Sequence, residues 1–141
     1  MRYTHLLVAV SMSPESHRLV AKAVSIARPF QARLTLITLM SDPEMYNHLV
    51  APMMENVREV LAEETQQFMN ELVERAGYPV EQTIVTSGEL SEHVRHTCRT
   101  QSVDLVIYGN HNQGFFSRAT CSAKSIVGSS GVDVLLVPLE A

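Results

Sequence analysis

The stretch LLVAVSMSPE, residues 6–15, decides the fold because an unbroken apolar run leads directly into a helix start. Residues 6–10 carry no polar side chain, so we expect a strand that is covered on both faces. Ser13 is expected to cap the next helix, Pro14 to take its first position and Glu15 to favour the positive end of its dipole. A buried strand followed at once by a helix is the first unit of an α/β sheet.

The same order of strand and helix repeats along the chain. The first helix is expected to end at Arg28, because Pro29 disfavours helical backbone in the residue before it. Further strands are expected at residues 33–40, 80–86, 105–108 and 132–137, and further helices from 42 to a break at Pro52, from there to Gly77, at 89–100 and at 121–129. We therefore predict one doubly wound α/β domain over residues 1–141, with a five-stranded parallel sheet and helices on both faces.

Composition narrows the classes of protein that this chain can belong to. Of the 141 residues 45% are hydrophobic and 18% are charged, which excludes a disordered chain. The net charge of −4 argues against sequence-independent binding to nucleic acid or to an anionic membrane, which needs clustered Lys and Arg. Two cysteines are too few for a disulfide scaffold, and no apolar run approaches a membrane span. We expect a cytoplasmic protein without a targeting segment.

A ligand site in such a sheet is expected outside the carboxyl ends of the strands, where the strand order reverses. Residues 11–13, 38–42, 87–89 and 109–114 occupy those ends. The segment 109–114 is the most polar and contains two glycines, so it is the candidate phosphate loop. This segment matches neither of the phosphate-binding motifs GxxxxGK[ST] and GxGxxG. Its spacing alone therefore fits an ordinary polar loop better than a phosphate loop.

Three segments of the chain resemble the universal stress protein family. They are LVAVSMSPES at residues 7–16, DLVIYGNH at 104–111 followed by Ser117-Arg118, and VDVLLVP at 132–138. The resemblance covers essentially the whole chain. It implies the strand order 3-2-1-4-5, dimerisation, a cytoplasmic location and a role in surviving stress, including DNA-damaging agents.

The resemblance also bears on nucleotide binding, because the family contains ATP-binding members and members of the universal stress protein A type, which generally do not bind ATP. ATP-binding members have an aspartate after the first strand and a glycine pattern that closes with Gly-Ser or Gly-Thr. In this chain, Ser11 takes the position of the aspartate, and Asn112 takes the position of the second glycine. Ser122-Ala123 takes the position of the closing pair. The serine removes a charge-assisted acceptor, and the Asn112 side chain crowds the approach to phosphate. We therefore expect no cofactor.

Two alternatives stay open. The first is an ATP- or nucleotide-binding switch with at most slow ATPase activity, whose apolar adenine wall would include Leu39. Its pocket would use Ser11, Leu39, Gly109, Asn112, Gln113, Ser122 and Ser125. The second is a hydrolase with Ser11 or Cys121 as nucleophile and His111 as base, although the chain has no GxSxG motif. No metal site is expected, because the helical pair His93 and His96 lacks further ligands.

The last strand is the candidate interaction surface. It is strongly apolar, and under the family strand order it forms a sheet edge, which invites pairing with another chain. The predicted homodimer interface consists of Val132, Val134, Leu135, Leu136 and Val137. The chain is thus predicted to be a non-enzymatic stress-response homodimer that could also contact other proteins or related stress proteins, without direct contact to nucleic acid or membrane.

Overall fold

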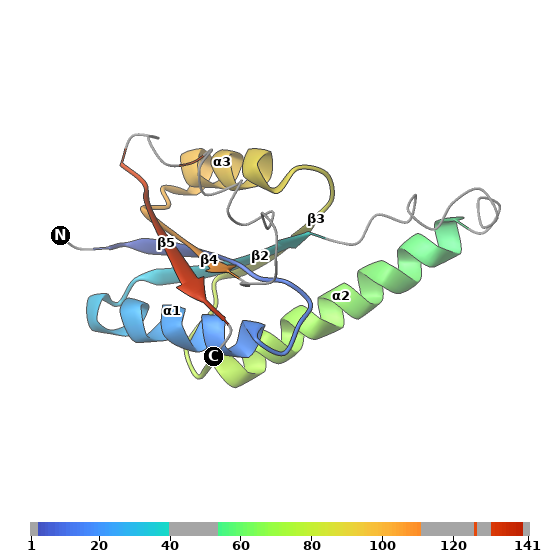
Figure 1. The fold of residues 1–141 in the computed structure, drawn as a ribbon, viewed down its shortest axis with the longest axis horizontal. Coiled ribbons are helices and arrows are strands. Elements are labelled where there is room, and N and C mark those ends of the chain that lie inside the picture. The colour runs from blue at the N-terminus through green and yellow to red at the C-terminus, as the bar shows by residue number, and fades with distance from the viewer. Residues whose placement is uncertain (1–2, 40–53, 111–125, 127–130, 140–141) are drawn as a thin grey trace.

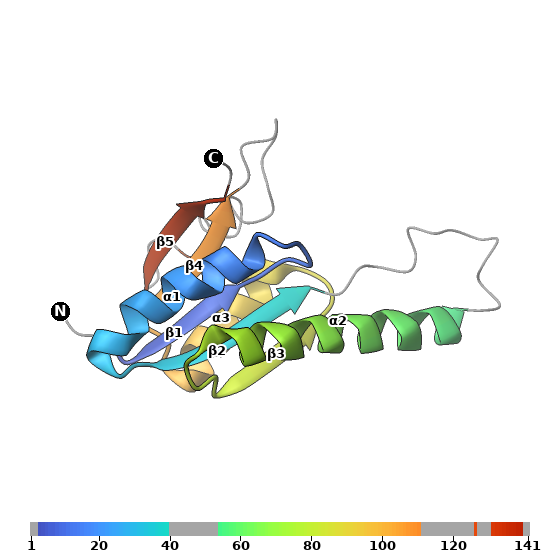
Figure 2. The ribbon, with the colours of Figure 1, turned by 90° about the horizontal axis from the view of Figure 1, so that it is seen from below.

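The computed structural model describes residues 3–39, 54–110, 126 and 131–139 of the chain. Five strands form one parallel sheet in the order β3-β2-β1-β4-β5, as the sequence and the resemblance predicted. The described elements are β1 (His5–Ala9), α1 (Ser16–Phe30), β2 (Arg33–Leu39), α2 (Met54–Ala76), β3 (Gln82–Thr86), α3 (Leu90–Gln101), β4 (Leu105–Asn110) and β5 (Asp133–Pro138). Helices α1 and α2 cover one face of the sheet and α3 covers the other (Figures 1 and 2).

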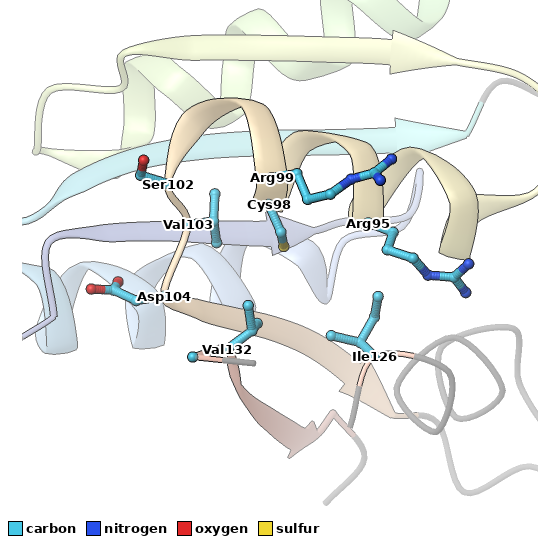
Figure 3. Close-up of a pocket in the computed structure, with 9 residues that line it drawn as sticks. Arg95, Cys98, Arg99, Ser102, Val103, Asp104, Ile126 and Val132 are labelled. Atoms are coloured by element: carbon cyan, nitrogen blue, oxygen red, sulfur yellow. The ribbon is translucent and has the colours of Figure 1, made fainter. Parts of the chain in front are cut away.

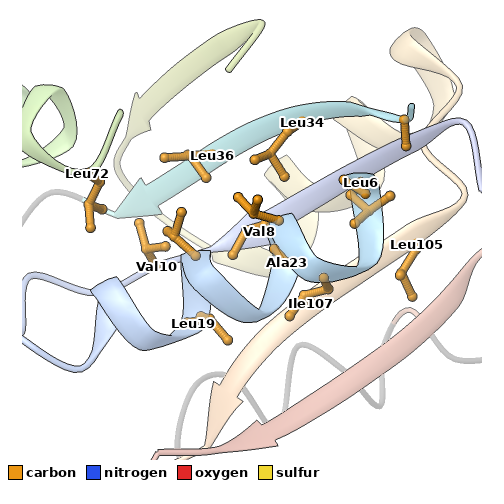
Figure 4. Close-up of a cluster of buried hydrophobic side chains, with 14 of the residues drawn as sticks. Leu6, Val8, Val10, Leu19, Ala23, Leu34, Leu36, Leu72, Leu105 and Ile107 are labelled. Carbon is orange, nitrogen blue, oxygen red and sulfur yellow. The ribbon is translucent and has the colours of Figure 1, made fainter. Parts of the chain in front are cut away.

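The central strand β1 supplies side chains to two separate cores. Leu6 and Val8 pack on the α1 and α2 side, in the cluster that Figure 4 shows, while Leu7 and Ala9 pack on the α3 side. Alternate residues of a strand point to opposite faces, so an apolar run without polar interruptions can be buried only if both faces are covered. The apolar run of β1 therefore accounts for the two helical layers.

The entry to α1 differs from the prediction. The helix begins at Ser16, and its N-cap residue Glu15 makes no side-chain cap hydrogen bond. Ser13 and Pro14 instead form a turn before the helix, because the backbone N–H groups of Ser16 and His17 donate to their carbonyl oxygens at 3.0 and 3.2 Å. The expected Ser13 cap was wrong, since the Ser13 hydroxyl pairs with the Ser11 hydroxyl at 3.1 Å.

The end of α1 also differs, because Pro29 lies inside the helix, which continues to Phe30. Gln31 follows in the left-handed conformation with φ 54°, and its N–H donates to the Arg28 carbonyl, while the N–H of Ala32 donates to that of Ala27. This is the pattern of a Schellman C-terminus, in which the last carbonyls are satisfied. Proline disfavours helical backbone in the residue before it but does not forbid it. The burial of Ala27 and Ala32 at this end of the helix outweighs that preference.

Several other boundaries were predicted within two residues. Helix α2 ends before Gly77, which has φ +65° as expected for a helix C-terminus. Strand β4 runs to Asn110, so Gly109 belongs to the strand and not to the loop that was expected to start there. The helix predicted from residue 42 to Pro52 lies outside the described residues. So does the helix predicted at 121–129, apart from Ile126, which is helical and buried.

A polar network holds the strands together at their amino ends. The Asp104 carboxylate accepts hydrogen bonds from the N–H of Thr4 at 2.9 Å, the hydroxyl of Thr4 at 3.0 Å and the N–H of His5 at 3.0 Å. The fully buried His5 donates from Nδ1 to the Gln101 carbonyl at 2.9 Å, so its Nε2 accepts from the Thr35 hydroxyl at 2.7 Å. These contacts join β1 to β2, to the end of α3 and to the start of β4.

Removing the Asp104 carboxylate should therefore destabilise the fold. We expect Asp104→Ala to lower the free energy of unfolding by about 1–2 kcal/mol, because the buried His5 N–H loses its acceptor while water can replace the contacts of exposed Thr4. Denaturant unfolding measures this loss. The control Glu63→Ala, on the exposed face of α2, should change stability by less than about 0.5 kcal/mol, and an equally small effect of Asp104→Ala would contradict the role of the network.

Candidate functional site

The strand order reverses between β1 and β4, so the carboxyl ends of these two strands mark the place where a ligand site is expected. Strand β1 pairs with β2 on one side and with β4 on the other, with Ala9 opposite Ile37 and Tyr108. Ser11 follows β1 directly, and Gly109 lies near the end of β4. The fold therefore brings these two predicted site residues, which are far apart in the sequence, to the same end of the sheet, where the strands have their carboxyl ends.

The turn after β1 is closed by serine side chains. The buried Ser16 hydroxyl donates to the Ser11 carbonyl and accepts from the Ser11 N–H at 3.2 Å, so it binds both backbone groups of that residue. The side chain of Ser11 is exposed, and its hydroxyl lies 3.1 Å from that of Ser13. Ser11 is thus presented at the sheet edge on a closed backbone turn, with a neutral hydroxyl in reach of a ligand.

Leu39 lies at the same edge as Ser11. The pairing of β1 with β2 continues beyond Ala9, because the Val10 N–H donates to the Ile37 carbonyl at 2.9 Å and the buried Thr38 hydroxyl donates to the Val10 carbonyl at 2.7 Å. Thr38, which precedes Leu39, is thereby bonded to Val10, which precedes Ser11. Leu39 is half-buried, so it offers an apolar surface next to the serine turn.

Gly109 lies in β4, where a side chain would meet Leu139 and Leu19. A Cβ on Gly109 would lie 2.4 Å from Cδ1 of Leu139 and 3.3 Å from Cδ2 of Leu19. The backbone that follows β5 is held there, because the Arg18 guanidinium donates to the Leu139 carbonyl at 2.9 Å and the Leu139 side chain is buried. Contact between the end of the chain and β4 therefore explains this glycine without any ligand.

A double-mutant cycle tests this explanation. Gly109→Ala should lower the free energy of unfolding by about 1–3 kcal/mol, because the new methyl group overlaps the Leu139 side chain. In the background of Leu139→Ala the same substitution should cost at least about 1 kcal/mol less, measured by denaturant unfolding of all four proteins. An equal cost in both backgrounds would show that Leu139 is not what excludes a side chain at this position.

The histidine pair on α3 does not form a metal site with other described residues. The half-buried His93 donates from Nε2 to the Ser87 carbonyl at 2.7 Å and contacts the Thr86 hydroxyl, whereas His96 is exposed. In the part of the chain that the structure describes, no group of three or more His, Cys, Asp or Glu side chains could hold a metal ion. The other predicted residues, Asn112, Gln113, Ser122 and Ser125 with the hydrolase candidates His111 and Cys121, lie outside the described residues.

Sequence reasoning missed Ser16 and Leu139, which help to build this end of the sheet, and it included Thr38 only within the range 38–42 without a role for its side chain. Ser16 lies five residues after Ser11, a spacing that offered a signal for a side chain folding back onto the turn. Thr38 offered a weaker signal, as a polar residue in an apolar strand. Leu139 gave none, because its contact with Gly109 joins residues 30 positions apart that only the sheet brings together.

Comparison with known proteins agrees with this architecture. A family model described as the universal stress protein family matches residues 2–138, which is nearly the whole chain. The chain belongs to the universal stress protein family. It is 65% identical to universal stress protein C of Salmonella typhimurium over 99% of this chain and 98% of that protein, and 38% identical to universal stress protein A of Escherichia coli K12 over 99% and 97%.

Solved structures of the universal stress protein family share the fold. The protein UspA from Lactobacillus plantarum superposes with a TM-score of 0.72 at 18% identity, covering 97% of this chain and 99% of that one. A universal stress protein in complex with cAMP superposes with a TM-score of 0.64 at 19% identity, covering 99% and 100%. Within the described ranges, no helix has both the length and the apolar character needed to span a membrane.

Proposed function

We propose that this universal stress protein acts as a non-enzymatic cytoplasmic homodimer in the stress response, including resistance to DNA-damaging agents, and that it takes no cofactor. The observation that carries the proposal is the 65% identity to universal stress protein C over nearly the whole of both chains. The surface that supports a dimer is the outer edge of β5, which is the last strand in the sheet order. The proposed partner is therefore a second copy of the chain.

The backbone of β5 leaves a row of groups on its outer side. The Asp133 N–H donates to the Asp104 carbonyl next to β4, at 3.0 Å, and backbone groups of successive strand residues point to alternate sides. Those of Val134 and Leu136 therefore point away from β4. Leu136 is 39% exposed, so part of its apolar surface is in contact with water. An antiparallel partner strand would satisfy these backbone groups and cover this side chain.

The opposite edge of the sheet is a weaker candidate. Strand β3 has five residues, and three of them are Gln82, Thr83 and Thr86. Residues 134–137 of β5 are all apolar. Burying the β5 edge therefore removes more apolar surface from water, and that burial is the main favourable contribution to most association. We propose β5 rather than β3 as the strand that pairs.

A charge at Leu136, an exposed apolar position of β5, should separate the dimer. Leu136→Lys puts a charged side chain into the apolar strand that would pair in each copy, and a lysine on an edge strand opposes pairing with another strand. We expect a monomer by light scattering, with an unchanged circular dichroism spectrum, because Leu136 is already partly exposed. The control Val60→Lys replaces another apolar side chain, 53% exposed on α2, and should stay dimeric. A Leu136→Lys protein that remains a dimer would exclude pairing through β5.

Survival measurements test the biological part of the proposal. A strain that lacks this protein should survive ultraviolet irradiation less well, and expression of the natural chain should restore survival. Expression of Leu136→Lys to the same level should not restore it if the dimer is the active form. Equal survival with and without the protein, under the stress conditions tested, would contradict the proposed role.

A nucleotide-binding switch is the second candidate, and the family's fold supports it. A universal stress protein of the same fold was solved in complex with cAMP. In this chain, Ser11 and Leu39 lie at the edge where such a ligand would be expected. The neutral Ser11 hydroxyl is a weaker partner for a ribose hydroxyl or a metal-bound water than the carboxylate of ATP-binding members would be.

Thermal unfolding with nucleotide separates the two candidates. A ligand that binds only the folded state must raise the melting temperature, so millimolar ATP or cAMP should leave it unchanged if the chain binds neither. Native mass spectrometry of freshly purified protein should then find the dimer mass without added ligand. A rise in melting temperature that Ser11→Ala diminishes would favour the switch, and copurified nucleotide would overturn the proposal that the protein takes no cofactor.

A further inference from the structure

A pocket of about 630 Å³ lies on the α3 face of the sheet, away from the turn at Ser11. It lies between α3, the start of β4 and the stretch that leads into β5, and it is open to solvent on one side (Figure 3). Its volume falls within the range of about 300–1,000 Å³ that is typical of small-molecule sites. The described residues that line it are Arg95, Cys98, Arg99, Ser102, Val103, Asp104, Ile126, Gly131 and Val132.

The interior of the pocket is apolar. Figure 3 shows the Cys98 sulfur pointing into the space between α3 and the side chains of Ile126 and Val132. Val103 and Ile126 are buried, and Val132 packs against the apolar cluster on the α3 side of the sheet. Burial raises the pKa of the Cys98 thiol to about 11, so this side chain is uncharged at neutral pH. The interior therefore offers a surface for an apolar group.

The charges around the pocket are arranged along one direction. Arg95 and Arg99 lie one turn apart on α3, both are exposed, and both lie toward the same end of the pocket in Figure 3. Asp104 lies at the other end, where its carboxylate already accepts hydrogen bonds from Thr4 and His5. An anion is thus attracted to the arginine end and repelled from the aspartate end.

We propose that this pocket binds a small amphipathic carboxylate, such as a medium-chain fatty acid, with its carboxylate at the two arginines and its chain along the apolar interior. Guanidinium groups bind carboxylates through charge-assisted hydrogen bonds, and the apolar chain gains by leaving water. An uncharged alcohol of the same chain length would lack the charge that the arginines attract. The site is separate from the turn at Ser11, and it shares only Val132 with the predicted dimer interface. Binding of the carboxylate can therefore be tested without reference to the oligomeric state.

Calorimetric titration of the full chain with decanoate, below its micelle concentration, tests the charge pattern. We expect saturable binding that the double variant Arg95→Gln and Arg99→Gln weakens by about tenfold or more, through loss of the charge-assisted bonds. The control Lys22→Gln removes one exposed positive charge from α1, on the opposite face of the sheet, and should leave the affinity unchanged. Decanol, which has the same chain length and no charge, should bind at least tenfold more weakly than decanoate.

Protection of Cys98 tests the position of the ligand without any substitution. Saturating decanoate should slow the alkylation of Cys98 by N-ethylmaleimide at least fivefold, measured by peptide mass spectrometry, with the rate for free glutathione in the same sample as a reference. The proposal is overturned if decanoate does not bind, or if it binds without protecting Cys98. It is also overturned if the double arginine variant binds decanoate as tightly as the natural chain does.

Discussion

The requirement that β1 be covered on both faces determines most of this structure. Leu6, Leu7 and Val8 are fully buried, and successive residues face opposite helical layers. Because a strand without a polar face cannot border water, one helical layer would not be enough. The chain therefore places β2 on one side of β1 and β4 on the other, with helices above and below. The reversal of strand order beside β1 follows from this arrangement, and so does the position of the candidate site.

The two ends of the sheet use polar groups differently. At the amino ends, Asp104 and His5 are committed to hydrogen bonds that join three strands and a helix. At the carboxyl ends, Ser16 and Thr38 satisfy backbone groups of the turn after β1, while the Ser11 hydroxyl is left at the surface. The polar groups at the amino ends are used within the fold, whereas the Ser11 hydroxyl at the carboxyl ends is exposed.

Three surfaces in the described part of the chain are candidates for binding a partner or a ligand, each for a different physical reason. The β5 edge has backbone groups that point away from the sheet, the turn at Ser11 has polar groups at a reversal of strand order, and the α3 pocket has an apolar interior beside two arginines. Membership in the universal stress protein family accounts for the fold that builds all three. The side chains of this chain decide what each surface can bind, because a shared fold does not carry a ligand with it.

The sequence by itself determined the alternation of strands and helices, because apolar runs and turn residues act over short distances along the chain. The strand order followed from the resemblance to the family. The sequence also placed Ser11 and Leu39 at one edge of the sheet, because all strands of a parallel sheet end on the same side. The start of α1, the contact of Gly109 with Leu139 and the α3 pocket were decided only by the tertiary structure. Each of these depends on contacts through space, made by side chains whose neighbours are known only once the sheet and helices have packed.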